Sequence, residues 1–308
     1  MTAFLFPGQG SQTPGMAADL YDTSPEARAI LDDADAVLGF ALTELMFGDD
    51  ADALKPTEIT QPALYAHSLA ADAALRARGV RPDIAAGHSL GEWSALAATG
   101  ALSFADGLRA VRRRGELMAR AGSVRPGAMS AVLGMEAGAL DAVCAEATEA
   151  GEGVVVPANY NDPGQIVISG DGPAVERAGT LAGERGARRV VPLPVSGAFH
   201  SPLMAFARDG LAETLYALAI SAPACPVVLN VTAAPTTDPE EIRTRLLEQL
   251  TAPVRWAQSL QAIADAGATR YVEVGAGKVL SGLVKRTLGR DAATAQAGTA
   301  AALDALAD

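Results

Sequence analysis

Apolar residues near the start of the chain recur first at strand spacing and then at helical spacing, with glycine-rich turns between. Residues 3–6 are all apolar and are followed by proline and glycine, which predicts a short strand and then a loop. Helical spacing predicts helices over 25–38, with proline at the first position, and over 61–78. A short strand at 84–86 then leads through a tight turn into a helix ending at Ala98. This order of elements is typical of an α/β fold.

The middle of the chain follows a different order. After a helix that carries Arg114 and Met118, the pattern predicts strand, helix, strand, strand, helix and strand, at 128–133, 136–150, 153–158, 165–170, 173–186 and 188–192. This order is that of the ferredoxin-like split motif. We therefore predict a small ferredoxin-like domain over 125–195, inserted into a larger one.

The α/β pattern resumes after the predicted insertion. The elements expected there are helices at 202–218, 239–250, 256–267 and 278–288 and strands at 227–229 and 270–274. The alanine-rich residues 291–308 are expected to form a weakly ordered tail or a last short helix. We expect 1–124 and 196–308 to form one discontinuous, α/β-hydrolase-like domain with a parallel sheet.

Composition and charge exclude several classes of protein. The 308 residues are 49% hydrophobic and 19% charged, which excludes an intrinsically disordered chain. The formal charge of -12 argues against binding to nucleic acid, because such binding depends on neutralising phosphates with basic side chains. No uncharged apolar run is long enough to span a bilayer, and no basic residue precedes the N-terminal apolar run as in a signal peptide. We expect a cytoplasmic protein that binds neither nucleic acid nor membranes.

The two cysteines indicate neither a metal site nor a disulfide framework. Cys144 and Cys225 are far apart and show no Cys-x-x-Cys or Cys/His spacing. We therefore expect no bound metal.

Residues 87–91, Gly-His-Ser-Leu-Gly, match the G-x-S-x-G pattern of a nucleophile turn. The pattern is weak alone, but here it follows a predicted strand and precedes a predicted helix, which is the context that the turn requires. We interpret Ser89 as a nucleophile. The alternative is a serine that only caps the following helix.

A serine hydroxyl needs a base that accepts its proton, and the chain has three histidines. His88 cannot turn back onto its own neighbour, and His67 lies within a predicted helix among apolar residues, where a packed or surface histidine is the simpler interpretation. His200 lies in an irregular segment where the two predicted domains join, and clefts form at such places. His200 is the better candidate base.

Several further motifs occur along the chain in one order. They are FPGQGSQ at 6–12, GHSLGE at 87–92, RRRG at 112–115, GAFHSPLM at 197–204, QL at 249–250, PVRW at 253–256 and VEVGAGKVL at 272–280. Together they resemble the malonyl-CoA:acyl carrier protein transacylase family, and the resemblance covers essentially the whole chain.

The resemblance implies a role for each of the reacting groups. Ser89 would accept the acyl group, His200 would be the general base, and the main-chain carbonyl of Gln249 would orient the imidazole. The main-chain N–H groups of Gln9 and Leu90 would form the oxyanion hole.

No catalytic aspartate is then required. The aspartates that we considered are interpreted as turn or surface residues: Asp162, Asp171 and Asp209.

Arg114 follows Ser89 by 25 residues, the spacing at which the family has an arginine that binds the free carboxylate of malonyl. A guanidinium suits this task because its two parallel N–H groups bind a carboxylate in a fixed orientation. Consecutive helical residues point about 100° apart, so only one of Arg112, Arg113 and Arg114 can face a pocket. The remaining substrate-binding residues that we expect are Phe199, Met118, Asn159, Asn161 and Gln165, although asparagine and glycine are also ordinary turn residues.

Two glycine-rich segments lack the full pattern of a nucleotide site. Gly275-Ala276-Gly277-Lys278 is followed by Val279 instead of serine or threonine, and the loop at 8–10 has Thr13 where a third glycine would be needed. We expect no cofactor, and coenzyme A would enter only as part of the substrate.

The predicted function is a ping-pong transfer of malonyl from malonyl-CoA to the phosphopantetheine thiol of an acyl carrier protein, in fatty acid biosynthesis, by a monomer. A discrete acyltransferase that serves a polyketide synthase, a serine esterase or thioesterase, and a binding module without chemistry are the alternatives.

Overall fold

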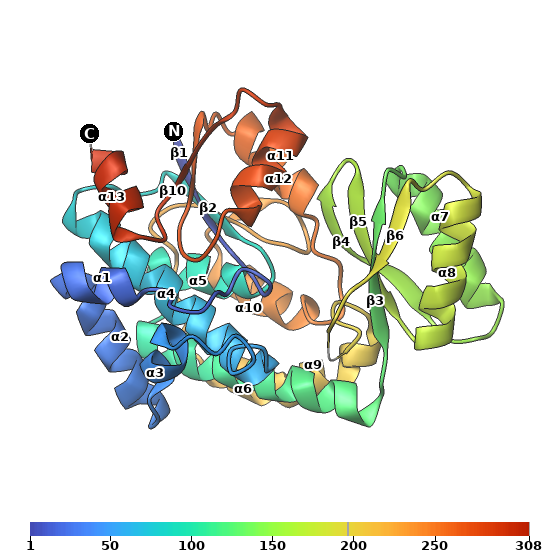
Figure 1. The fold of residues 1–308 in the computed structure, drawn as a ribbon, viewed down its shortest axis with the longest axis horizontal. Coiled ribbons are helices and arrows are strands. Elements are labelled where there is room, and N and C mark those ends of the chain that lie inside the picture. Colours follow the sequence, from blue (N-terminus) through green and yellow to red (C-terminus); the bar gives the residue numbers. More distant parts are fainter. Residues whose placement is uncertain (196, 308) are drawn as a thin grey trace.

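The computed structural model describes residues 1–195 and 197–307 and contains two separate β-sheets (Figure 1). Ser196 and Asp308, the two ends of the second predicted segment of the large domain, lie outside the described residues. Among the described residues, the first sheet has six strands, in the spatial order β10 (Ala293–Gln296), β9 (Arg270–Glu273), β1 (Thr2–Phe6), β2 (Ile84–Gly87), β7 (Val227–Val228) and β8 (Pro235–Thr236). All neighbours are parallel except β7 and β8.

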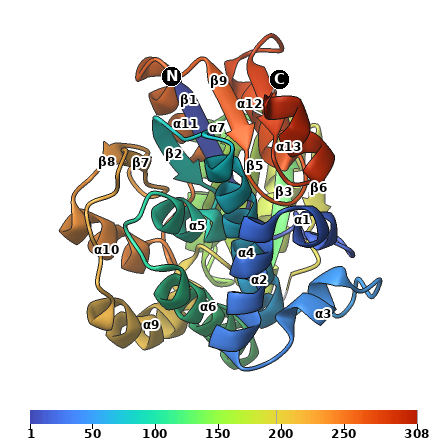
Figure 2. The same cartoon turned by 90° about the vertical axis from the view of Figure 1, so that its left-hand side faces the viewer.

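Alternate residues of the central strand β1 face opposite sides of this sheet. Phe4 and Phe6 belong to one hydrophobic core, whereas Ala3 and Leu5 belong to a second. The helices that contribute to the first core are α1 (Ala18–Thr23), α2 (Pro25–Leu38), α3 (Leu42–Phe47), α4 (Thr57–Ala77), α5 (Leu90–Ala98), α6 (Phe104–Val124), α9 (Ala205–Ala217), α10 (Pro239–Glu248) and α13 (Ala300–Ala307). The second core is covered by α11 (Trp256–Asp265) and α12 (Val279–Leu288), so the sheet has helices on both faces (Figure 2).

The second sheet is antiparallel. Its strands in the described part of the chain are, in spatial order, β4 (Val155–Asp162), β5 (Gln165–Gly170), β3 (Ala128–Leu133) and β6 (Arg189–Pro192). Val132 and Ile168 pack into a third core with α7 (Ala137–Glu149) and α8 (Gly172–Glu184), at the right of Figure 1. Met129 and Ala131 face the other way and join the first core. Both faces of the second sheet are therefore covered.

The predicted α/β class with a parallel sheet is confirmed, and most of the predicted elements are present. The predicted helix at 61–78 begins earlier, at Thr57, so that Pro62 lies inside α4. A proline within a helix cannot donate a hydrogen bond to the carbonyl four residues earlier. Arg112 donates to that carbonyl, of Glu58, at 2.7 Å. A hydrogen bond from another helix therefore replaces the missing one.

The end of the chain is more regular than expected. Residues 291–308 were expected to form a weak tail or a helix, and they contain both the edge strand β10 and the helix α13. The strand predicted at 153–158 extends to Asp162. The short elements α1, α3 and β8 were not predicted. Within the described residues, no helix combines the length and the apolar character that crossing a membrane would require.

Candidate active site

Ser89 lies in the turn between β2 and α5, at the carboxyl end of the central strands. Its backbone has φ 53° and ψ −104°, a conformation that costs about 1–3 kcal/mol for a residue with a side chain. The flanking glycines permit the turn: a Cβ on Gly91 would lie 2.0 Å from the carbonyl oxygen of Phe6, on the neighbouring strand. The sequence pattern thus allows α5 to begin directly against β1.

His200 approaches Ser89 from the segment that returns from the second sheet to the 3₁₀ turn η1 (Pro202–Met204). Its Nε2 lies 2.8 Å from Ser89 Oγ, and its Nδ1 lies 2.9 Å from the main-chain oxygen of Gln249. A carbonyl oxygen only accepts hydrogen bonds, so Nδ1 carries the proton and Nε2 offers a lone pair to the serine hydroxyl. This geometry suits proton transfer from Ser89 to His200.

Arg114, on α6, is 1% exposed and reaches the same serine. Its Nη2 donates to Ser89 Oγ at 3.1 Å and to Gln249 Oε1 at 3.0 Å, and its Nη1 donates to Gln61 Oε1 at 2.8 Å. All three acceptors are neutral oxygens. The adjacent Arg112 and Arg113 instead form ion pairs with Glu116, so one arginine of the three faces the pocket.

Burial and charge keep the histidine in its basic form. Burial lowers the pKa of His200 to about 3, and the positive charge of Arg114 acts in the same direction. Burial also lowers the pKa of Arg114 to about 10, which leaves the guanidinium charged at neutral pH. The site therefore combines an unprotonated imidazole with a permanent positive charge.

A cavity of about 130 Å³ adjoins Ser89. The predicted residues that line it are Gln9, Ser89, Leu90, Arg114, Met118, Asn159, Phe199 and His200. Asn161 and Gln165 are not brought there. They line a neighbouring cavity of about 140 Å³, together with Gln9 and His88.

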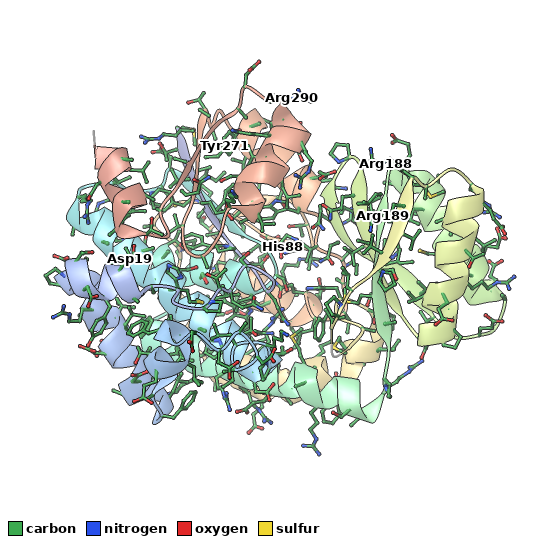
Figure 3. The ribbon with its side chains drawn as sticks, in the orientation of Figure 1. Asp19, His88, Arg188, Arg189, Tyr271 and Arg290 are labelled. Atoms are coloured by element: carbon green, nitrogen blue, oxygen red, sulfur yellow. The ribbon has the colours of Figure 1, made fainter. Side chains whose placement is uncertain are left out.

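His88 lines both cavities and contacts both parts of the molecule. Its Nε2 lies 2.8 Å from Asn161 Oδ1 on β4, and its ring lies 5.4 Å from that of Trp256 on α11. Figure 3 shows His88 at the centre of the molecule, between the two sheets. Asn161 therefore contacts the nucleophile turn through His88.

Asp162 lies deeper than the sequence interpretation implied, whereas His67 is packed, one of the two positions expected for it. Asp162 is the last residue of β4, directly before the turn, and its Oδ1 accepts from the N–H of Gly164 in that turn. Its side chain is buried, and its Oδ2 accepts a hydrogen bond from Arg286 Nε at 2.5 Å. His67 is buried as well, and its Nε2 lies 2.8 Å from the carbonyl oxygen of Gly298, away from Ser89.

Several polar residues around Ser89 were not identified from the sequence. They are Gln61, Glu92, Asn230 and the side chain of Gln249, all buried. Glu92 and Gln249 lie in the motifs GHSLGE and QL, but no task was predicted for their side chains, and Gln61 lies within a helix, where the sequence gives no signal of a site. Asn230 follows the predicted strand at 227–229, and the carboxyl end of a parallel strand was a usable signal. Within the described residues, no group of three or more His, Cys, Asp or Glu side chains is arranged to hold a metal ion.

Comparison with known proteins gives consistent results. A family model described as an acyl transferase domain matches residues 3–303. The malonyl CoA-acyl carrier protein transacylase of Bacillus subtilis (strain 168) is 49% identical over 284 residues, 92% of this chain and 89% of that protein.

Solved structures are similar over the full length. An acyl carrier protein S-malonyltransferase from Vibrio cholerae has a TM-score of 0.94 at 42% identity and covers 99% of both chains. A malonyl transacylase in complex with its type II polyketide synthase acyl carrier protein has a TM-score of 0.93 at 39% identity, covering 98% of this chain and 97% of that one.

Glu92 gives the site a dependence of stability on pH. Burial raises the pKa of its carboxyl to about 8 from an ordinary value of 4.5, against the opposing effects of the Asn230 N–H, Gln249 and Arg114. Between these two pH values the folded chain binds a proton that the unfolded chain has lost, so the free energy of unfolding decreases as pH rises.

We predict that Glu92→Gln removes this decrease. The Tm of the variant minus that of the wild type should increase from about pH 5 to about pH 8 and then level off. Differential scanning fluorimetry across this range measures the difference, with Glu149→Gln at an exposed position on α7 as the control for losing an acidic charge. A difference that is independent of pH would contradict the prediction.

Proposed function

The chain belongs to the acyl transferase family, and on that premise we propose that it transfers the malonyl group from malonyl-CoA to the phosphopantetheine thiol of an acyl carrier protein. The names of the B. subtilis relative and of the V. cholerae structure support this substrate pair, and the complex with a carrier protein supports the partner.

The observation that carries the proposal is the state of Arg114. It is a buried guanidinium beside the candidate nucleophile, and it takes part in none of the ion pairs in the described part of the chain. Glu92 is an acidic residue near Arg114, and burial favours the neutral form of its carboxyl. A buried charge without a counter-ion favours an anionic ligand, and the free carboxylate of malonyl supplies one. A neutral acyl group would leave the charge unpaired.

The first half-reaction follows from the hydrogen bonds of Ser89. Its Oγ attacks the thioester carbon of malonyl-CoA while its proton moves to Nε2 of His200. The C–S bond breaks, the thiolate of coenzyme A takes the proton from His200, and malonyl stays on Ser89 as an ester. In the second half-reaction the carrier thiol gives its proton to His200 and attacks this ester, and Ser89 Oγ leaves with the proton.

We assign the oxyanion hole to the main-chain N–H groups of Gln9 and Leu90. Among the described residues neither N–H donates a hydrogen bond, and both residues line the cavity at Ser89. Free donors of this kind stabilise the negative charge that develops on the thioester oxygen. Met118, Asn159 and Phe199 would enclose the acyl group. Asn161 and Gln165 would contact the thioester's leaving group in the adjoining cavity.

The two sheets support the predicted division into domains. We assign 125–195 to an inserted ferredoxin-like domain, because its element order is strand, helix, strand, strand, helix, strand and its sheet order is β4-β5-β3-β6. Residues 1–124 and 196–308 would form an α/β-hydrolase-like domain around the parallel sheet. The chemistry described above requires no cofactor, and the protein would act in the cytoplasm as a monomer.

Fatty acid biosynthesis is the pathway that we favour, and a polyketide synthase is the second candidate, because one structural neighbour is bound to a polyketide carrier protein. Comparing kcat/KM for purified fatty acid and polyketide carrier proteins distinguishes these two. A serine esterase would share Ser89 and His200 but would not need Arg114.

We predict that malonyl-CoA forms an ester on Ser89 and that Ser89→Ala abolishes it. The hydroxyl supplies reactivity, and its loss leaves the fold unchanged. Intact-protein mass spectrometry detects the adduct, and added holo carrier protein should remove it as malonyl-carrier rather than as malonate. Release mainly to water would favour an esterase, and adduct formation by the alanine variant would reject Ser89.

We predict that Arg114→Ala lowers kcat/KM for malonyl-CoA by about one to two orders of magnitude, the equivalent of one hydrogen bond to a charged group. Acetyl-CoA has no free carboxylate, so its turnover should fall much less, by the amount that the contact of Arg114 with Ser89 Oγ contributes. Arg114→Lys keeps the charge without the planar fork and should restore malonyl transfer only in part. The measurement is the ratio of malonyl to acetyl kcat/KM, and an unchanged ratio would show that Arg114 does not recognise the carboxylate.

A further inference from the structure

The peptide groups around Ser89 are held by a residue that the reaction scheme does not yet include. Asn230 lies two residues after the end of β7, the strand next to β2 in the parallel sheet, and it is 0% exposed. Its Oδ1 accepts a hydrogen bond from the N–H of Ser89 at 2.7 Å, and its Nδ2 donates to the carbonyl oxygen of Gly87 at 2.7 Å. One side-chain amide thus binds the chain on both sides of His88.

Asn230 is itself fixed on its main-chain side. Its N–H donates to Glu92 Oε2 at 2.5 Å, and its carbonyl oxygen accepts from the N–H of Arg255 at 3.0 Å. Glu92 belongs to the first turn of α5, and its own N–H donates to the carbonyl oxygen of Ser89 at 3.1 Å. Ser89, Glu92 and Asn230 therefore form a closed ring of hydrogen bonds beneath the nucleophile.

We propose that Asn230 is a positioning residue of the acyl transfer: its amide holds the strained Ser89 turn in the conformation that directs Oγ to His200. The turn needs such support because Ser89 has positive φ without being glycine. If the Ser89 peptide relaxed, the direction of Oγ relative to His200 and Arg114 would change. This inference rests on the proposed function only for the choice of substrate.

Asparagine satisfies both contacts whatever the pH. An ionised aspartate would accept from the N–H of Ser89 but could not donate to Gly87, and leucine has nearly the same shape but neither donates nor accepts. The N–H of Ser89 donates to Asn230 Oδ1 and is therefore not free to donate to an oxyanion. The donors left for that task are those of Gln9 and Leu90.

The test compares Asn230→Asp and Asn230→Leu with the wild type. We expect both variants to acylate about tenfold to a hundredfold more slowly at saturating malonyl-CoA, since a misdirected nucleophile loses rate on this scale. KM should stay within about threefold, and the malonyl to acetyl ratio should be unchanged, because Asn230 does not touch the acyl group. The ratio separates this effect from that of Arg114→Ala. Quenched-flow mass spectrometry gives the acylation rate.

Thr99→Val is the matched control. Thr99 is a buried residue at the other end of α5, and its hydroxyl donates to the carbonyl oxygens of Ala95 and Leu96. The variant loses a buried hydrogen bond of the same helix and should lower Tm without slowing acylation. If it slows acylation as much as the Asn230 variants at a similar Tm, the effect is one of stability and the proposal is wrong.

A substrate-independent reagent separates this inference from the proposed function. An alkyl fluorophosphonate phosphonylates Ser89 Oγ with loss of fluoride, and His200 takes the proton. Both Asn230 variants should react more slowly than the wild type by the same factor as in acylation, even if malonyl-CoA proves not to be the substrate. An aspartic acid that is protonated could keep both contacts, so the rate is measured across the pH range in which its carboxyl ionises. A folded Asn230→Asp protein that reacts at the wild-type rate throughout that range overturns the proposal. A rise in KM with an unchanged acylation rate also overturns it. Should Asn230→Leu fail to fold, the aspartate variant alone decides.

Discussion

The hydrogen bond between Ser89 Oγ and His200 Nε2 is the contact on which the arrangement of the site depends. It joins two residues 111 positions apart, and both have positive φ, 53° and 57°. Each such conformation costs about 1–3 kcal/mol, so local preference opposes both ends of the bond. Tertiary contacts hold them: Gly91 lets α5 begin against β1, and the carbonyl of Gln249 fixes the imidazole. The reactive geometry is therefore a property of the tertiary structure and of neither segment alone.

Periodicity predicted those elements whose buried faces repeat regularly. The strands predicted at 128–133 and 165–170 coincide with β3 and β5, because alternate residues of β3 pack into different cores. The start of α4 was missed because a bond from Arg112 to Glu58 offsets the proline, and that partner belongs to another helix. β10 was missed because its four residues, Ala-Thr-Ala-Gln, have no strand pattern and pair with the open edge of β9. Both failures come from contacts between distant segments.

The same distinction applies to the site. Ser89 and His200 could be selected from the sequence because they lie in irregular, glycine-containing segments with a recognisable pattern. Gln61 and Glu92 lie within regular helices, and a buried amide or carboxyl there looks like any helical residue until the fold brings its partners near. The side chain of Gln249 illustrates the limit. The resemblance implied a task for its main chain, whereas its amide also joins Arg114 to the carbonyl of Ser89.

The charge of Arg114 acts on both reacting partners at once. It lowers the pKa of His200, which keeps the base unprotonated, and it leaves positive charge beside Ser89 with only amide and hydroxyl oxygens as acceptors. A buried charge without a counter-ion costs several kcal/mol, and an ionised Glu92 would reduce that cost. It would also reduce what a substrate carboxylate gains by binding. Because burial favours the neutral form of Glu92, this carboxyl does not neutralise the charge of Arg114. The strongest counter-ion available to Arg114 is therefore the carboxylate of the substrate.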